Sequence, residues 1–151
     1  MATLYFLLDT LKQAGHRITP QRKAICQALA ESKEHPSAQQ IYEQLRREDD
    51  TLSLATVYNT LDALVNAGAI NILGDAGDDA LHYDADTEPH VNLACISCHR
   101  IVDIPSRYVH HLDEEIEQTS GYRLLGSRVL YYGLCPNCQK KEVSKGSAAA
   151  Q

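Results

Sequence analysis

Four of the five cysteines form two Cys-x-x-Cys pairs, Cys95 with Cys98 and Cys135 with Cys138. Two residues between thiolates allow one turn to present both sulfurs to an ion, and two such turns complete a tetrahedral zinc site. In a reducing compartment this pattern favours metal ligation over the two alternatives, which are two disulfides and a redox Cys-x-x-Cys motif. Four sulfurs leave no open coordination position, so we expect a structural Zn²⁺ and no enzyme activity. The fifth cysteine, Cys26, is expected in a hydrophobic core.

Histidines and carboxylates form a second group of potential ligands. The group consists of His35, His82, Asp84, Asp86, Glu88, His90 and Asp103. Imidazole and carboxylate together suit Fe²⁺, Mn²⁺ or Zn²⁺. Several of these residues flank the polar segment 85–89, which ends in Pro89 and is typical of a hinge. A metal bound there could hold two domains in one orientation; the alternative is that each residue is an ordinary polar surface residue.

A third candidate site is a helix predicted over residues 53–67. Its buried face is predicted to contain Leu54, Val57, Leu61, Leu64 and Val65. The opposite face is predicted to enter the DNA major groove through Ala55, Thr56, Asn59 and Thr60, with Tyr58 at its border. Asn can bond adenine through two hydrogen bonds, and Thr and Tyr can contact thymine methyl groups. The alternative is a solvent-exposed helix face with no DNA partner.

The charge distribution supports a nucleic-acid role for the first third of the chain. The net charge is −6, but residues 1–47 hold seven basic and four acidic side chains. Residues 48–90 hold ten acidic side chains and no Lys or Arg. One basic region can therefore face phosphates, and we expect Arg17 and Arg22 to contact them. The alternative is a solvated surface with uneven charge.

The elements that position these residues fall into two predicted domains. Helices are predicted over 3–14, from Thr19-Pro20 to Leu29, over 37–47 and over 53–67. A hairpin follows, with strands at 69–73 and 80–84 around the turn 74–79. Helices followed by a small hairpin are typical of a winged helix-turn-helix domain, in which 37–47 and 53–67 form the helix-turn-helix pair.

The period of apolar residues changes after the hinge. Strands are predicted over 90–95, 100–104 and 122–133, and an amphipathic helix is predicted over 107–119. We therefore predict an α+β protein with a winged-helix DNA-binding domain (1–84), a hinge (85–89), a small C-terminal α/β dimerisation domain with the four-cysteine zinc site (90–142) and a disordered tail (143–151). The apolar run 4–8 is too short for a membrane span, so we expect a cytoplasmic protein.

Over residues 4–142 the chain resembles the ferric uptake regulator (Fur) family. The motifs behind this resemblance are RITPQR (17–22), HPSAQQIY (35–42), LATVYNTL (54–61), HVNLAC (90–95) and both Cys-x-x-Cys pairs. Family members usually have Gly after the second cysteine, where this chain has His99. The resemblance implies a repressor that binds double-stranded operator DNA as a homodimer, with a structural zinc and a regulatory metal at the hinge.

In the peroxide-sensing branch of the family the regulatory ligands are three His and two Asp. By position, His35, Asp84, His90 and Asp103 match four of them, and Asn92 stands where the fifth ligand is usually His. Asn can still offer a weaker carbonyl oxygen; the candidates to replace it are His82, Asp86 and Glu88. The resemblance therefore implies peroxide sensing through regulatory Fe²⁺ or Mn²⁺. The alternative is a plain iron-, manganese- or zinc-responsive repressor.

Overall fold

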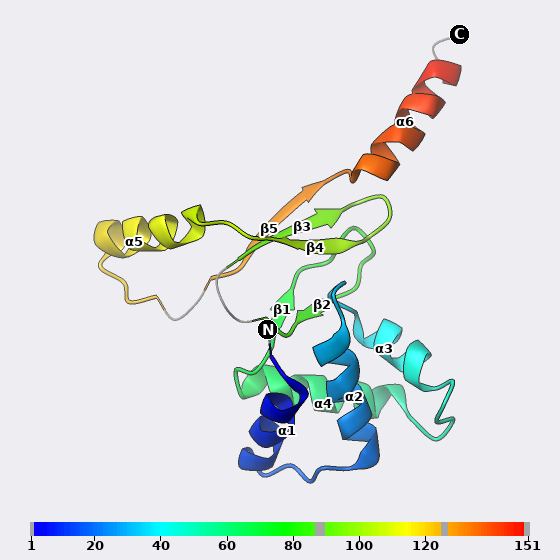
Figure 1. Cartoon of the computed structure of the whole chain (residues 1–151), viewed down its shortest axis with the longest axis vertical. Coiled ribbons are helices and arrows are strands. Elements are labelled where there is room, and N and C mark those ends of the chain that lie inside the picture. The colour runs from blue at the N-terminus through cyan, green and yellow to red at the C-terminus, as the bar shows by residue number, and fades with distance from the viewer. Residues whose placement is uncertain (1, 87–89, 125–126, 150–151) are drawn as a thin grey trace. The chain divides into compact units, whose positions relative to one another are not determined.

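The structure is a computed structural model that describes residues 2–86, 90–124 and 127–149, with the backbone alone for 145–149. The chain divides into two compact units (Figure 1). The first contains Met1–Gly74 and Leu81–Glu88, and the second contains Asp75–Ala80 and Pro89–Gln151. Residues 87–89 of the predicted hinge, including the candidate ligand Glu88, lie outside the described residues. Among the described residues, no helix is both long and apolar enough to cross a bilayer.

The first unit contains four helices and a two-stranded hairpin. The helices are α1 (Leu4–Gln13), α2 (Pro20–Glu31), α3 (Ala38–Leu45) and α4 (Leu54–Asn66). The antiparallel hairpin pairs β1 (Asn71–Leu73) with β2 (His82–Asp84). The predicted caps are confirmed, because the side chains of Thr19, Ser37 and Ser53 each accept a hydrogen bond from a backbone N–H in the first turn of their helix.

The core of the first unit lies between the four helices. Its fully buried side chains include Leu7, Leu11, Ile25, Cys26, Val57, Leu61 and Leu64. Burial raises the pKa of the Cys26 thiol to about 11, so Cys26 stays a protonated core residue, as its sequence position predicts. Leu54 and Val65, which we expected in the buried face of α4, are only half-buried.

The second unit is built on a three-stranded sheet. The central strand β3 (Val91–Cys95) pairs antiparallel with β4 (Ile101–Ile104) and parallel with β5 (Val129–Gly133). The helices are α5 (Tyr108–Ser120), close to its predicted bounds, and α6 (Pro136–Ala149). The third strand begins at residue 129 instead of 122, and α6 runs through residues 144–149, which we expected to be disordered.

Candidate metal centres and DNA-binding helix

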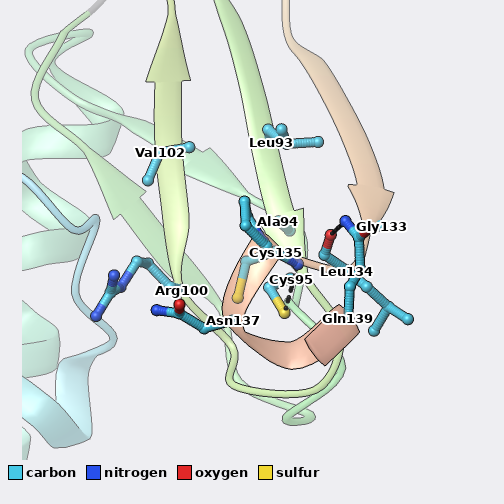
Figure 2. A pocket seen from close by; sticks show the side chains of 11 residues that line it. Leu93, Ala94, Cys95, Arg100, Val102, Gly133, Leu134, Cys135, Asn137 and Gln139 are labelled. Carbon is cyan, nitrogen blue, oxygen red and sulfur yellow. Dashed lines mark hydrogen bonds between the residues drawn. The ribbon is translucent and has the colours of Figure 1, made fainter. Parts of the chain in front are cut away.

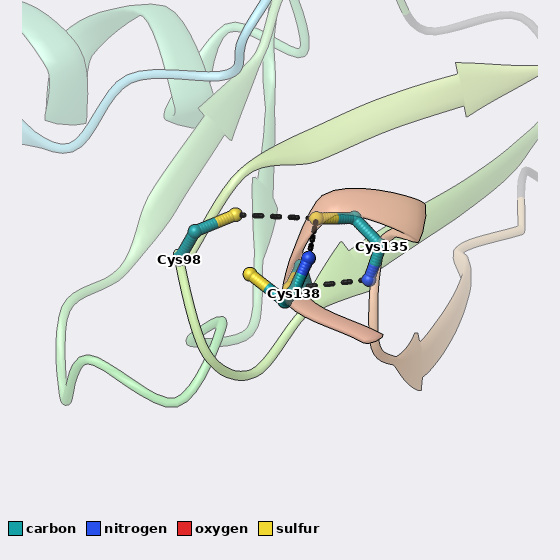
Figure 3. A group of neighbouring side chains, drawn as sticks. Cys98, Cys135 and Cys138 are labelled. Carbon is teal, nitrogen blue, oxygen red and sulfur yellow. Dashed lines mark hydrogen bonds between the residues drawn. The ribbon is translucent and has the colours of Figure 1, made fainter. Parts of the chain in front are cut away.

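The four cysteines of the two Cys-x-x-Cys pairs come together where β3 and β5 end. Cys95 is the last residue of β3 and Cys98 lies in the following turn, while Cys135 precedes α6 and Cys138 lies in its first turn. Figure 3 shows Cys98, Cys135 and Cys138 gathered at one place. Their Sγ atoms all lie within 4.8 Å of one another, and those of Cys98 and Cys135 are 3.9 Å apart. Two sulfurs bound tetrahedrally to one zinc, each at about 2.3 Å, are about 3.8 Å apart. The geometry therefore fits a closed structural zinc site.

Backbone groups prepare two of these thiols for metal binding. The Cys135 N–H donates to the Cys95 Sγ over 3.4 Å (Figure 2), and the Cys138 N–H donates to the Cys135 Sγ over 3.4 Å. Backbone N–H bonds from Cys135 and then Cys98 lower the pKa of the Cys95 thiol to about 6. The N–H of Cys138 likewise lowers the pKa of Cys135. Zinc binds the thiolate, so these bonds favour the form of each sulfur that acts as a ligand.

A pocket of about 530 Å³ borders the cysteine cluster (Figure 2). Its wall includes Cys95 and Cys135 together with the apolar side chains of Leu93 and Val102 from the sheet. The same wall also includes the polar side chains of Arg100, Asn137 and Gln139, so the hollow beside the cluster has a mixed lining.

A buried pair of regulatory-ligand candidates lies in the first unit. His35 precedes α3 and Asp84 ends β2; they are 5% and 2% exposed. The His35 Nδ1 lies 3.3 Å from the Asp84 Oδ1, which also accepts a hydrogen bond from the Asp86 N–H over 2.9 Å. Two neighbouring ligand atoms at about 2.1 Å from an octahedral ion are about 3.0 Å apart, so this pair is nearly spaced for one metal.

His82 positions His35. The segment before α3 lies along β2, because the Tyr83 N–H donates to the Pro36 carbonyl and Ser37 forms an isolated bridge with His82. The His82 Nδ1 lies 2.6 Å from the His35 carbonyl oxygen. A carbonyl can only accept, so this assigns the proton to Nδ1. The bond supports a His35 backbone held at a φ of 50°. Among the described residues, His82 belongs to no group of three or more potential metal ligands.

Three further candidates meet in the second unit. The His90 Nε2 lies 3.1 Å from the Asn92 Oδ1 and 3.4 Å from the Asp103 Oδ1. Asn92 and Asp103 are cross-strand partners on β3 and β4. The buried Asn92 amide donates from Nδ2 to the Val129 carbonyl over 3.4 Å, which turns its oxygen toward His90. One imidazole nitrogen and two oxygens thus converge, and Asn92 is oriented as an oxygen ligand.

The exposed face of α4 differs from the prediction at one residue. Ala55, Tyr58 and Asn59 are exposed and Thr56 is half-buried, as a DNA-facing surface requires. The prediction for Thr60 is wrong: it is 1% exposed and its hydroxyl donates to the Thr56 carbonyl over 2.8 Å. At 100° per residue, position 60 adjoins the stripe that packs into the core, and a threonine hydroxyl can be satisfied there by the preceding turn.

The two candidate phosphate-binding arginines are linked to each other. Arg17 is exposed in the loop between α1 and α2, and the half-buried Arg22 donates from its guanidinium to the Arg17 carbonyl. Arg22 also has its backbone N–H capped by Thr19. Arg22 therefore holds the loop that carries Arg17, a role that the sequence pattern did not indicate.

Together these features define the class of protein to which this chain belongs. A helical unit that ends in a small hairpin, joined to a sheet unit with a closed four-cysteine centre, is a winged-helix protein with a zinc-stabilised second domain of α+β type. The chain matches the ferric uptake regulator family over residues 1–132. It belongs to that family, as the motifs predict.

Characterised relatives match nearly the whole chain. The peroxide operon regulator of Bacillus subtilis is 36% identical over 135 residues, which cover 89% of this chain and 92% of that protein. The structure of PerR from Streptococcus pyogenes is 37% identical, with a TM-score of 0.52, covering 92% of this chain and 95% of that one. A zinc-bound manganese uptake regulator is 27% identical, with a TM-score of 0.67, covering 85% of this chain and 98% of that one.

Proposed function

We propose that this protein is a cytoplasmic, metal-dependent transcriptional repressor that binds operator DNA as a homodimer and senses peroxide. The observation that carries the proposal is the pair of half-sites described above, one of His35 and Asp84 and one of His90, Asn92 and Asp103. All five side chains offer nitrogen or oxygen and none offers sulfur, a set that suits Fe²⁺ or Mn²⁺. Similarity to two peroxide regulators supports the choice of signal.

The two half-sites belong to different units, and this suggests how a signal reaches DNA. An ion that bound residues of both groups would couple the DNA-binding unit to the dimerisation unit. In a homodimer, the orientation of the two units sets the distance between the two α4 helices, which must match the two halves of a symmetric operator. Such coupling would shift the population toward the DNA-binding form by as much as the ligands of both groups bind the metal more tightly in that form.

The peroxide response requires a redox-active ion beside an oxidisable side chain. Fe²⁺ supplies the electrons that activate peroxide when it is bound. His35 and His90 each hold an imidazole at the site, where either ring can gain one oxygen atom from H₂O₂ as the second oxygen leaves as water. An imidazole that has gained oxygen is a poorer ligand, so the site loses its metal and the protein releases DNA.

Mapping of oxygen addition tests this proposal. Protein loaded with Fe²⁺ and treated with one equivalent of peroxide is expected to gain 16 Da, the mass of one oxygen atom, at His35 or His90 and to lose operator affinity. Protein loaded with Mn²⁺ is the control and is expected to show neither change. Oxidation confined to the cysteine thiols, or modified histidines with unchanged DNA affinity, would contradict peroxide sensing.

One observation favours the alternative of a manganese-responsive repressor without peroxide chemistry. Asn92 replaces an imidazole by an amide oxygen, and oxygen ligands suit Mn²⁺ better than softer ions. The similarity to a manganese uptake regulator points the same way. If Mn²⁺ restores full DNA binding and Fe²⁺-loaded protein resists peroxide, this alternative replaces the first.

Operator recognition is assigned to the exposed face of α4. Tyr58→Ala and Asn59→Ala are each expected to weaken binding to a selected operator by about 1–3 kcal/mol, the usual loss when one base-edge contact is removed. Asn66→Ala is the matched control, because Asn66 is exposed at the far end of the same helix. Fluorescence anisotropy with operator DNA measures the effect. If both variants bind like the Asn66 control, α4 is not the recognition helix.

A further inference from the structure

The turn between β1 and β2 has a composition that does not suit DNA. Residues 75–80 contain Asp75, Asp78 and Asp79 and no basic side chain, so phosphates would be repelled. Two of the carboxylates instead shape the turn. The Asp75 Oδ1 accepts from the Gly77 N–H over 2.9 Å, and the Asp78 Oδ1 accepts from the N–H groups of Ala76 and Ala80, each over 3.3 Å. These bonds hold the turn in one conformation, which leaves the Ala76 carbonyl oxygen able to accept a hydrogen bond from another segment.

The hydrogen-bond donor to the Ala76 carbonyl is His99. The His99 Nδ1 lies 2.9 Å from the Ala76 oxygen and must donate to it. Ala76 is completely buried although Asp75 and Gly77 on either side are exposed. The turn thus packs within the second unit, while both strands of its hairpin belong to the first.

A second contact brings the two backbones together. Gly77 has a φ of 87°, and a Cβ atom added there would lie 3.0 Å from the Ile96 carbonyl oxygen. Ile96 lies inside the Cys95–Cys98 turn, which we call the zinc knuckle. Glycine at position 77 is therefore required both by its conformation and by the closeness of the knuckle.

The position of His99 depends on the zinc knuckle. His99 directly follows Cys98, and its N–H donates to the Cys95 carbonyl over 2.8 Å. Its φ is 65°, a left-handed conformation that explains why glycine suits this position. A glycine could adopt the same backbone but could not bond to Ala76. The histidine therefore adds a contact to the turn at the cost of a less favourable backbone.

We propose that His99 is a positioning residue that anchors the β1–β2 turn to the zinc knuckle. The anchor makes the hairpin of the DNA-binding unit depend on the zinc site of the dimerisation unit. The predicted hinge at 85–89 is one connection between the units. The chain also passes from one unit to the other at 74–75 and at 80–81, and the anchored turn lies between these two points. Its effect on DNA binding rests on the proposed repressor function; the anchor itself does not.

Hydrogen–deuterium exchange on the zinc-loaded full chain tests the anchor. His99→Gly keeps the left-handed backbone and removes the ring, so the amides of residues 75–80 are expected to exchange about five- to ten-fold faster, as the loss of one hydrogen bond predicts. His99→Asn is expected to restore protection, because asparagine tolerates this φ and its amide can donate where Nδ1 does. Zinc content is expected to stay at the wild-type level in both variants.

Asp79→Gly is the matched control, since Asp79 is also left-handed, with a φ of 56°, and no described contact joins it to the knuckle. It is expected to keep the turn protected. Wild-type exchange rates in His99→Gly would overturn the proposal, and so would loss of its zinc, because His99 would then act on the metal site itself.

Operator binding supplies the second readout. His99→Gly is expected to bind DNA about five- to ten-fold more weakly than Asp79→Gly, since an unanchored hairpin must be ordered on binding. Equal affinities would overturn the link between the anchor and DNA. If the wild-type protein bound no operator at all, the proposed function would fail, while the exchange measurement would still decide whether the anchor exists.

Discussion

A Cys95→Ser protein is expected to lose its zinc and, with it, the folded second unit. The variant removes the sulfur that accepts the Cys135 N–H and whose pKa is lowered to about 6. Loss of a residue that hydrogen-bonds to a metal ligand weakens metal binding about 10- to 100-fold. Loss of a ligand itself is therefore expected to weaken zinc binding more than about 100-fold. Because zinc binding is coupled to folding, the dimer is expected to dissociate.

Metal analysis after dialysis against a mild chelator, together with light scattering and thermal unfolding, measures these effects. Cys26→Ala is the control, because it also removes one thiol but from the core of the first unit. It is expected to lower the melting temperature and keep one zinc per chain. A Cys95→Ser protein that remains a zinc-loaded dimer of wild-type stability would show that the four cysteines do not form the site.

His90→Ala and Asp103→Ala are expected to abolish metal-stimulated DNA binding without releasing the structural zinc. Each variant removes one of the atoms that converge in the second unit, so the affinity for the regulatory metal is expected to fall more than about 100-fold. Asn92→His is expected to have the opposite effect, since imidazole is a stronger ligand than an amide oxygen for these ions.

Anisotropy titrations of operator complexes with Mn²⁺ measure this affinity without oxidation. Asp113→Ala serves as the control, because it removes a carboxylate from α5, which contributes no proposed ligand. If His90→Ala, Asp103→Ala and Asn92→His all titrate like the wild type, the proposed regulatory site is wrong.

Features encoded over a few residues could be predicted from the sequence. The caps at Thr19, Ser37 and Ser53 placed α2, α3 and α4 closely, because an N-cap and its partner N–H lie within three residues. The zinc site followed from two local spacings. Pro136, at the first position of α6, is a favoured start for a helix, yet the small, polar sequence beyond it led us to expect disorder.

Features that depend on contacts between distant residues were missed. The bond from His82 to the His35 carbonyl spans 47 positions, and that from His99 to Ala76 spans 23. In the sequence, His82 was a spare ligand candidate and His99 an unexplained replacement for glycine. The prediction for Thr60 failed for another reason. A helix turns by 100° per residue, so whether a residue at the border of two faces is buried or exposed depends on how the helix packs.

Strand β3 links the four-cysteine cluster to the proposed regulatory site. It carries Asn92 and Cys95, which lie about 10 Å apart along the strand at about 3.3 Å per residue. The register of β3 against β4 places Asn92 opposite Asp103, and the same strand ends in a zinc ligand. Zinc that orders the end of β3 is therefore expected to order the strand that carries Asn92 as well, and so to favour metal binding at the proposed regulatory site. By thermodynamic reciprocity, occupancy of the regulatory site is then expected to tighten zinc binding by the same factor, so that depletion of either metal weakens the binding of the other.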